Sequence, residues 1–210
     1  MSQHYLVIVA LGDSLTTGYQ HPSEDNPAGL EYPYPRILQL LMWKEITKLK
    51  IDLNPVVENE GIVGESTKGM LRRFDSTIPS LKPDYVIIWS GINDLTSGVS
   101  ADAVVSNLKE IYKKTRAINA TPIACTIAPI VSVPKVIEII LTCNKKIEEL
   151  AKSENIQLID LYKTLSNKEG QLRAEYNNDG IHLNVKGYTK VATTIFEEAV
   201  KPIIKKLKFL

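Results

Sequence analysis

The sequence contains little cysteine and little histidine: two cysteines and three histidines among 210 residues. Cys125 lies in an apolar, strand-like run and Cys143 in a helix-like run. They have neither the spacing of metal ligands nor the pattern of a disulfide framework. We therefore expect both cysteines to be reduced packing residues, and we expect no metal site.

A strong charge imbalance and long apolar runs are also missing. The formal net charge is +1, which gives no reason to expect a nucleic acid or an anionic membrane as a partner. The apolar run at 5–11 is far too short to span a bilayer. The first residues lack the charged region, apolar stretch and cleavage site of a signal peptide. The pattern favours a cytoplasmic protein without stable membrane insertion, and it leaves the oligomeric state open.

Short apolar runs alternate with longer segments of helical periodicity. The runs that predict strands lie at 5–11, 55–59, 84–90, 122–128 and 156–161, and the segments that predict helices lie at 34–49, 66–73, 101–118, 135–153 and 186–206. Runs such as VIIW are apolar throughout, as expected of strands that are covered on both faces. The alternation predicts one α/β domain over 1–210, with helices on both sides of a parallel sheet.

Small polar residues and glycines follow three of the predicted strands, in GDSLT (12–16), NEGIVGEST (59–67) and SGINDL (90–95). Ligands of open α/β sheets bind beyond the carboxyl ends of the strands. That edge of the sheet is therefore the candidate active site. One long, breaker-rich loop at 20–35 is predicted to be functional or mobile.

The histidines narrow the choice of a catalytic base. His4 precedes the first predicted strand and should lie at the opposite end of the sheet, and His21 lies in the breaker-rich loop, where nothing obvious would hold it. His182 follows Asp179 by three residues, so the carboxylate can reach the imidazole across a turn. By elimination, Ser14, His182 and Asp179 form a candidate catalytic triad. The alternative is that DGIH is only a turn before the last helix, in which Asp179 binds local backbone.

Four blocks, GDSLT, NEGIVG, GIND and DGIH, occur once each and in this order. Together they resemble the four blocks of the SGNH hydrolases, also called the GDSL esterase/lipase family. The resemblance implies a flavodoxin-like, three-layer α/β/α sandwich with a five-stranded parallel sheet. It also implies hydrolysis of small-molecule esters through an acyl-serine, an esterase or lysophospholipase type of activity that needs no cofactor or metal.

The resemblance assigns roles to single residues of this sequence. Ser14 matches the nucleophile, placed where a strand end meets a helix start that favours developing negative charge. Asp179 and His182 match the acid and the base. The backbone N–H groups of Ser14 and Gly64 and the side-chain amide of Asn93 match the oxyanion hole. Glycine suits position 64 because a Cβ could crowd the acyl carbon.

Three neighbouring polar residues are expected to have structural roles. Asp13 should bind the backbone of its own loop, Asn59 should hold the loop of the second block, and Asp94 should support the fold. Other functions remain open: a carbohydrate O-deacetylase or an acyltransferase of the same fold, or a flavodoxin-like domain that only binds a ligand.

Apolar residues near the predicted strand ends suggest an acyl groove. Leu95 follows the third block, and Ile130 and Val131 follow the fourth predicted strand. We expect these three side chains to line a groove for short to medium acyl chains, with the loop at 20–35 able to close over it. The alternative is that they simply pack on adjacent helices.

Overall fold

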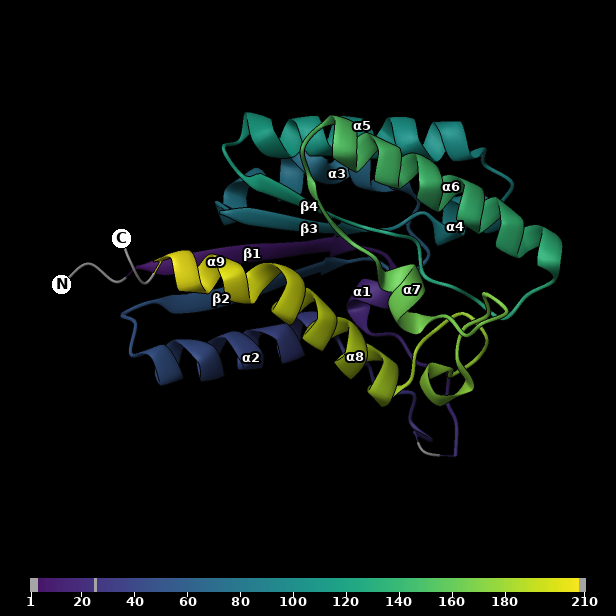
Figure 1. Ribbon diagram of the computed structural model, residues 1–210, viewed down its shortest axis with the longest axis horizontal. Coiled ribbons are helices and arrows are strands. Elements are labelled where there is room, and N and C mark those ends of the chain that lie inside the picture. Colours follow the sequence, from purple (N-terminus) through teal and green to yellow (C-terminus); the bar gives the residue numbers. More distant parts are fainter. Residues whose placement is uncertain (1–3, 25, 208–210) are drawn as a thin grey trace.

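The computed structural model describes residues 4–24 and 26–207. At its centre is a parallel sheet whose five strands follow the order β2-β1-β3-β4-β5. Figure 1 shows β2, β1, β3 and β4 in this order, from bottom to top. The strands are β1 (Tyr5–Gly12), β2 (Asn54–Gly61), β3 (Tyr85–Trp89), β4 (Thr121–Cys125) and β5 (Gln157–Ile159). The chain order reverses between β1 and β3, and ligands of such sheets bind beyond the carboxyl ends of the strands at this reversal.

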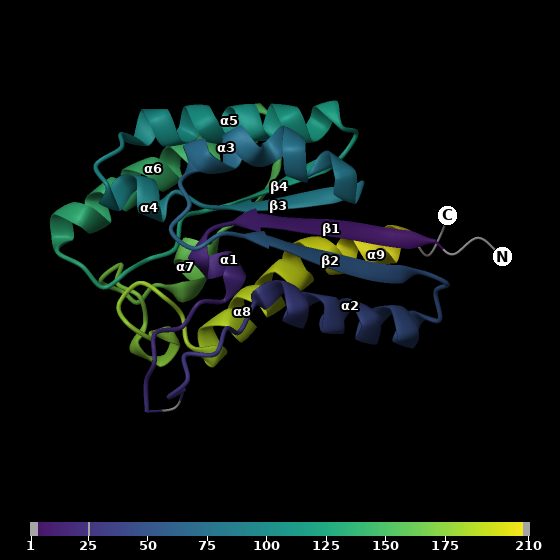
Figure 2. The same ribbon diagram turned by 180° about the vertical axis from the view of Figure 1, so that it is seen from behind.

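Helices cover both faces of the sheet, as Figures 1 and 2 show from opposite sides. One layer contains α2 (Tyr34–Leu49), α8 (Val185–Ile195), the π-helical turn η3 (Phe196–Val200) and α9 (Lys201–Leu207). The other layer contains α3 (Thr67–Thr77), α5 (Ala101–Ala117) and α6 (Pro134–Ser153). The three-layer α/β/α arrangement and the five-stranded parallel sheet are thereby confirmed.

Each face of the sheet has its own apolar core. Along β1, Leu6 and Ile8 belong to the core that includes residues of α2 and α8, whereas Val9 and Leu11 belong to the core that includes residues of α3 and α5. In β3, residues 86–89 are all buried. Burial on both faces explains why these strands are apolar throughout.

The predicted elements agree closely with the observed ones. The largest difference is at the end of α3, which is predicted at residue 73 and observed at residue 77. The helix start expected at Ser14 is α1 (Ser14–Thr17). The sequence does not predict four short segments, because a single turn shows no periodicity: η1 (Pro79–Leu81), α4 (Ile92–Thr96), α7 (Leu161–Leu165) and η2 (Ala174–Tyr176).

Two glycines allow the ends of β1, β2 and β3 to come close together. A Cβ on Gly12 would overlap Thr16 Oγ1 and would lie 2.7 Å from the carbonyl oxygen of Trp89. A Cβ on Gly61 would lie 2.6 Å from the backbone nitrogen of Thr17. Side chains cannot be accommodated at such distances, so this edge of the sheet requires glycine at both positions.

Candidate active site

Ser14 lies directly beyond the carboxyl end of β1, at the first position of α1. Asp13 caps this short helix, with its Oδ1 accepting a hydrogen bond from the Leu15 N–H at 3.0 Å. Ser14 Oγ lies 2.9 Å from His182 Nε2, a distance that permits a direct hydrogen bond. The structure thus joins a serine and a histidine that are 168 positions apart in the chain.

Asp179 holds the imidazole with one oxygen and its own turn with the other. Oδ2 lies 2.7 Å from His182 Nδ1, and Oδ1 accepts bonds from the backbone N–H groups of Ile181 at 3.0 Å and His182 at 2.7 Å. Burial alone would raise the pKa of the Asp179 carboxyl, but these hydrogen bonds hold the pKa below its ordinary value. An ionised Asp179 favours a proton on Nδ1, which leaves Nε2 free to accept one from Ser14.

Tyr19 holds the imidazole from the side. The Tyr19 and His182 rings meet edge to face, with their centroids 4.6 Å apart. The buried Tyr188 of α8 donates a hydrogen bond from its hydroxyl to the Tyr19 carbonyl at 2.6 Å. The ring that contacts His182 therefore extends from an anchored stretch of backbone.

The loop at 20–35 is tied down at two places. The Asn178 side chain binds both backbone groups of His21: Oδ1 accepts from the His21 N–H at 2.6 Å, and Nδ2 donates to the His21 carbonyl at 3.1 Å. The base of the loop closes where the Tyr32 N–H donates to the Gly18 carbonyl at 2.7 Å. These bonds correct the expectation that nothing holds His21, because its backbone is fixed beside the turn that precedes His182.

Gly64 and Asn93 reach the same edge from the ends of β2 and β3. Gly64 lies in a turn that is closed by a 3.1 Å hydrogen bond from the Glu65 N–H to the Ile62 carbonyl. Asn93 donates from Nδ2 to the Glu65 carbonyl at 3.0 Å. A side-chain amide has two N–H groups. Within residues 4–24 and 26–207, no group accepts from the second one or from the Gly64 N–H.

The backbone conformation accounts for glycine at position 64. Its φ is +75°, a value that side chains disfavour and glycine adopts readily. Apart from Gly64 itself and its two chain neighbours, no atom of the described residues lies within 4 Å of the place that a Cβ would occupy. Within the protein itself, the turn therefore requires glycine here, and contacts with neighbouring atoms do not.

The three polar neighbours have structural partners, as predicted. The buried Asp94 accepts hydrogen bonds from the Thr67 N–H at 2.8 Å and from Thr67 Oγ1 at 2.7 Å. Asn59 Oδ1 accepts from the Gly61 N–H at 3.0 Å. Asp13 caps α1, as described above. The Asp94 bonds join the segment that carries Asn93 to the start of α3, whereas Asp13 and Asn59 each bind the backbone of their own segment.

Asp13 is next to Ser14, but its environment is opposite to that of Asp179. Its side chain is buried, and its Oδ2 has no hydrogen-bond partner in the part of the chain that the structure describes. Burial, together with the nearby carboxylates of Asp94 and Glu65, raises the pKa of Asp13 to about 7. A large share of the Asp13 side chains is therefore neutral near neutral pH.

The three residues predicted to line an acyl groove differ in exposure. Leu95 and Ile130 belong to the apolar core, with 8% and 4% of their surface exposed. The groove prediction is corrected for these two, because side chains packed in a core offer almost no surface to a substrate. Val131 is 52% exposed. Its N–H donates to the Gly180 carbonyl at 2.7 Å, which places it beside the turn that carries the imidazole.

Other exposed aliphatic side chains flank the serine. Ile62 and Val63 precede Gly64 and are 46% and 54% exposed, and Ile181 precedes His182 and is 39% exposed. The Ile62 N–H donates to the carbonyl at the end of β1 at 3.1 Å. The sequence does not single these residues out, because their exposure depends on turns that have no apolar periodicity.

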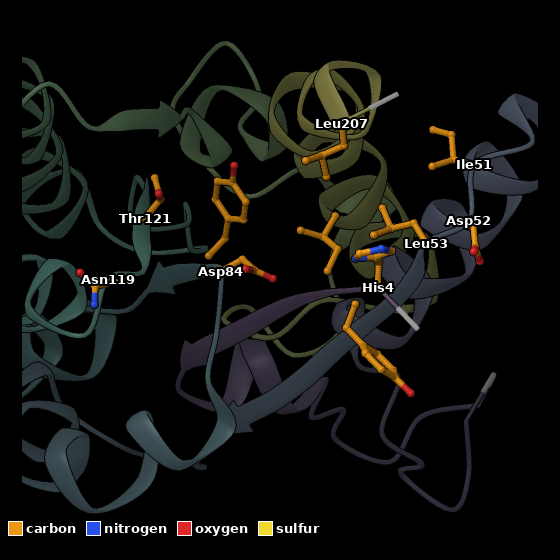
Figure 3. Close-up of a pocket in the computed structure, with 11 residues that line it drawn as sticks. His4, Ile51, Asp52, Leu53, Asp84, Asn119, Thr121 and Leu207 are labelled. Atoms are coloured by element: carbon orange, nitrogen blue, oxygen red, sulfur yellow. The ribbon is translucent and has the colours of Figure 1, made fainter. Parts of the chain in front are cut away.

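A cavity of about 610 Å³ opens at the other end of the sheet. Figure 3 shows its lining side chains, among them His4 before β1, Asp84 before β3 and Leu207 at the end of α9. His4 therefore lies away from Ser14, as expected. Among the described residues, neither a serine nor a cysteine lines this cavity.

Neither a cluster of metal ligands nor a membrane-spanning helix is found in the part of the chain that the structure describes. No group of three or more histidine, cysteine, aspartate or glutamate side chains could hold a metal ion. No helix is both long enough and apolar enough to cross a bilayer.

Comparison with known proteins gives one family match. The sequence matches the GDSL-like Lipase/Acylhydrolase family over residues 10–190. An uncharacterised lipoprotein of Bacillus subtilis, YqeF, is 32% identical over 133 residues, which are 60% of this chain and 50% of the relative. The chain thus spans about half the length of that curated relative.

Solved structures share the fold at low sequence identity. An acetyl xylan esterase, AlAXEase, is 24% identical with a TM-score of 0.72, and the match covers 92% of this chain and 100% of that one. The lipase/acylhydrolase from Enterococcus faecalis is 22% identical with a TM-score of 0.69, covering 97% and 95%. A catalytic mutant of Axe2, an acetylxylan esterase from Geobacillus stearothermophilus, is 19% identical with a TM-score of 0.72, covering 92% and 93%.

The raised pKa of Asp13 predicts a pH-dependent cost in stability. The unfolded chain loses this proton near its ordinary value of 3.8 and the folded chain near 7, so stability falls as pH rises across this interval. We expect Asp13→Asn to remove that loss. Its free energy of unfolding should rise relative to wild type by up to about 4 kcal/mol between pH 4 and pH 8.

Urea unfolding of both proteins across this pH range measures the difference. Asp52→Asn, at an exposed position, is the matched control and should follow the wild-type curve. A constant difference between Asp13→Asn and wild type at all pH values would contradict the prediction.

Proposed function

The chain belongs to the GDSL-like Lipase/Acylhydrolase family, and from that premise we propose that it hydrolyses carboxylic esters with short to medium acyl groups through an acyl-serine intermediate on Ser14. We treat 1–210 as one hydrolase domain with a small-molecule ester as its partner and no nucleic acid. The observation that carries the proposal is the chain of hydrogen bonds from Ser14 through His182 to Asp179.

In the first step, Ser14 Oγ attacks the ester carbonyl carbon. Its proton passes to His182 Nε2, which is 2.9 Å away. The imidazolium that forms is stabilised by the ionised Asp179 at Nδ1, 2.7 Å away. Tyr19 packs against the ring and limits its rotation while the proton moves.

The carbonyl oxygen becomes an oxyanion in this step. Three donors are available at the carboxyl ends of β1, β2 and β3: the Ser14 N–H, the Gly64 N–H and the second N–H of the Asn93 amide. All three are neutral, so they stabilise the developing charge without holding the carboxylate product as strongly as a cation would.

Collapse of the tetrahedral intermediate breaks the bond to the alcohol. The leaving oxygen takes the proton from His182 and departs as the free alcohol. Water then attacks the acyl-serine and gives its proton to His182. The second intermediate collapses by breaking the bond to Ser14 Oγ, which takes the proton back from His182 as the free acid is released.

The exposed aliphatic residues support binding of an acyl chain. Ile62 and Val63 lie on the Gly64 turn, and Val131 and Ile181 lie at the turn that carries His182. This set replaces the predicted groove of Leu95, Ile130 and Val131, of which only Val131 is well exposed. Binding of an acyl chain over these side chains would be favourable, because it removes apolar surface from water.

A carbohydrate O-deacetylase is the second candidate, since two of the structural relatives are named acetyl xylan or acetylxylan esterases. An acyltransferase would use the same acyl-serine with another acceptor in place of water. We propose a cytoplasmic location from the sequence pattern. Because the Bacillus subtilis relative is named a lipoprotein, fractionation of cells into membrane and cytoplasm is the direct test.

The triad assignment predicts a loss shared by its members. Ser14→Ala and His182→Ala should each lower kcat by about 10⁴-fold or more, and the double variant should be little worse than either, because the residues act as a unit. A fluorophosphonate should label wild type and should not label Ser14→Ala, as mass spectrometry of the intact protein would show.

His21→Ala is the matched control, since its imidazole is exposed and lies in the neighbouring loop. It should retain most of the activity. Loss of activity in His21→Ala with full activity in His182→Ala would overturn the assignment. An unlabelled wild type without esterase activity would favour the binding-domain alternative.

Removal of the Asn93 amide should act on the transition state. Asn93→Ala should lower kcat by about 10²–10³-fold with little change in KM, because the donor meets charge that exists only in the transition state. Steady-state kinetics on an aryl ester gives both constants. A change confined to KM would contradict this role.

The acyl proposal predicts a preference for chains longer than acetyl. Each buried methylene contributes up to roughly 0.8 kcal/mol, or up to about four-fold in kcat/KM per carbon, to a length of about four to eight carbons. Val131→Asp should penalise butyrate and hexanoate esters more than acetate.

Kinetics on a series of aryl esters, together with acetylated sugars and a lysophospholipid, tests this preference. Leu40→Asp is the control, because Leu40 is 63% exposed on α2. It should leave the chain-length profile unchanged. Strict preference for acetyl esters, or equal losses of kcat/KM in Val131→Asp for all chain lengths, would favour the carbohydrate O-deacetylase.

A further inference from the structure

The side chain of Arg73, in α3, forms hydrogen bonds with two glutamates, Glu60 and Glu65. Arg73 binds both carboxylate oxygens of Glu65, with Nε at 2.9 and 3.0 Å and Nη2 at 2.8 Å. The same guanidinium donates from Nη1 to Glu60 Oε2 at 3.1 Å and from Nη2 to the Glu60 carbonyl at 2.7 Å. Only 15% of the Arg73 side chain is exposed.

These contacts fix both ends of the segment at 60–65. Glu60 is near the end of β2, and Glu65 follows Gly64 directly. The guanidinium is planar and its donors have fixed directions. The distance between the Glu60 carbonyl and the Glu65 carboxylate is therefore set by one rigid group.

The segment between these ends has little other support. Ile62, Val63 and Gly64 are exposed. Besides the β1–β2 pairing that ends at Gly61, it is held by hydrogen bonds from the Gly61 N–H to Asn59 Oδ1, from the Ile62 N–H to the end of β1, and from the Glu65 N–H to the Ile62 carbonyl. Without Arg73, few packing contacts would fix the direction of the Gly64 N–H.

The contacts of Arg73 with Glu60 and Glu65, called the clamp below, are also connected to the Asn93 amide. The Glu65 carbonyl accepts a hydrogen bond from Asn93 Nδ2 at 3.0 Å, so a shift of Glu65 would turn the amide. Arg73 is thus connected to two donors on different loops: to the Gly64 N–H through the backbone, and to the free N–H of Asn93 through Glu65.

We propose that Arg73 and Glu65 are positioning residues of the oxyanion hole, holding the Gly64 and Asn93 donors at the spacing that the tetrahedral intermediate needs. This inference rests on the proposed ester hydrolysis. Neither side chain touches the ester. Because preorganised donors act on charge that develops in the transition state, displacing them lowers kcat and leaves substrate binding largely intact.

The test uses Arg73→Lys, Arg73→Gln and Glu65→Gln in the full chain. We expect Arg73→Lys and Arg73→Gln to lower kcat about 10- to 100-fold, with KM changed less than about three-fold. Lysine should not rescue, because a single ammonium cannot hold Glu60 and Glu65 in the same geometry. Glu65→Gln should give a smaller loss of the same kind.

A double-variant cycle separates this role from a general loss of structure. In an Asn93→Ala background, Arg73→Gln should cost several-fold less than in wild type, because one of the donors it positions is already gone. Equal losses in both backgrounds would overturn the proposal. So would an effect on KM alone, or full activity in all three single variants.

Arg116→Gln is the matched control. Arg116 also pairs with a glutamate, Glu154, at 3.1 Å, but on α5 and with 43% of its side chain exposed. It should leave kcat unchanged. Titration with a fluorophosphonate counts competent sites, so kcat is expressed per folded enzyme even where a variant folds poorly.

Failure of this inference is distinguishable from failure of the proposed function. Wild type that neither cleaves esters nor is labelled at Ser14 would refute the hydrolase itself. Active wild type with unchanged Arg73 variants would refute only the clamp.

Discussion

The close approach of backbone at Gly12 and Gly61 is the constraint on which the site depends. Three strand ends meet there at distances that leave no room for a Cβ. The turn after β1 can therefore rest against the loop after β2 and against the carbonyl end of β3. Ser14, Gly64 and Asn93 come from three separate strand ends, and this contact makes them neighbours. A residue larger than glycine at either position would push these ends apart before any catalytic group changed.

The second half of the site comes from the other end of the chain. His182 and Asp179 lie in one turn. This turn is stabilised independently of the contact between Asp179 and the imidazole, because Asp179 Oδ1 accepts two backbone hydrogen bonds. The other oxygen binds the imidazole. The local-turn and triad interpretations of DGIH are therefore compatible, because one carboxylate has enough acceptor capacity for both. Asn178 and Tyr188 then join this turn and α8 to the segment after α1.

The sequence predicts the layers and the placement of the motif residues, because strand burial and strand-end loops leave a pattern. It fails where the outcome depends on packing between distant segments. Leu95 and Ile130 follow predicted strand ends in the sequence, as residues of a groove would, yet both are buried in the apolar core. Tyr19 lies in a loop without periodicity, and no pattern links it to His182. Arg73 and Glu65 are eight positions apart, a spacing that does not mark neighbours on a helix. An ion pair between a loop residue and a helix residue at this spacing can be identified only from the three-dimensional structure.

Asp13 and Asp179 show why adjacency to Ser14 in the sequence is a poor guide to the acid of the proposed triad. Asp13 precedes Ser14 directly, but it is buried, one of its oxygens has no hydrogen-bond partner among the described residues, and its pKa rises to about 7. A carboxyl that is about half neutral near that pH stabilises an imidazolium less well than one that is fully ionised. Asp179 is 165 positions from Ser14 in the sequence, yet its hydrogen bonds keep its pKa low and its charge beside Nδ1. Environments that push the pKa values of two carboxyls in opposite directions separate their roles. The acid that can support a charged histidine is therefore the distant one, and the adjacent one caps the turn that carries Ser14, the proposed nucleophile.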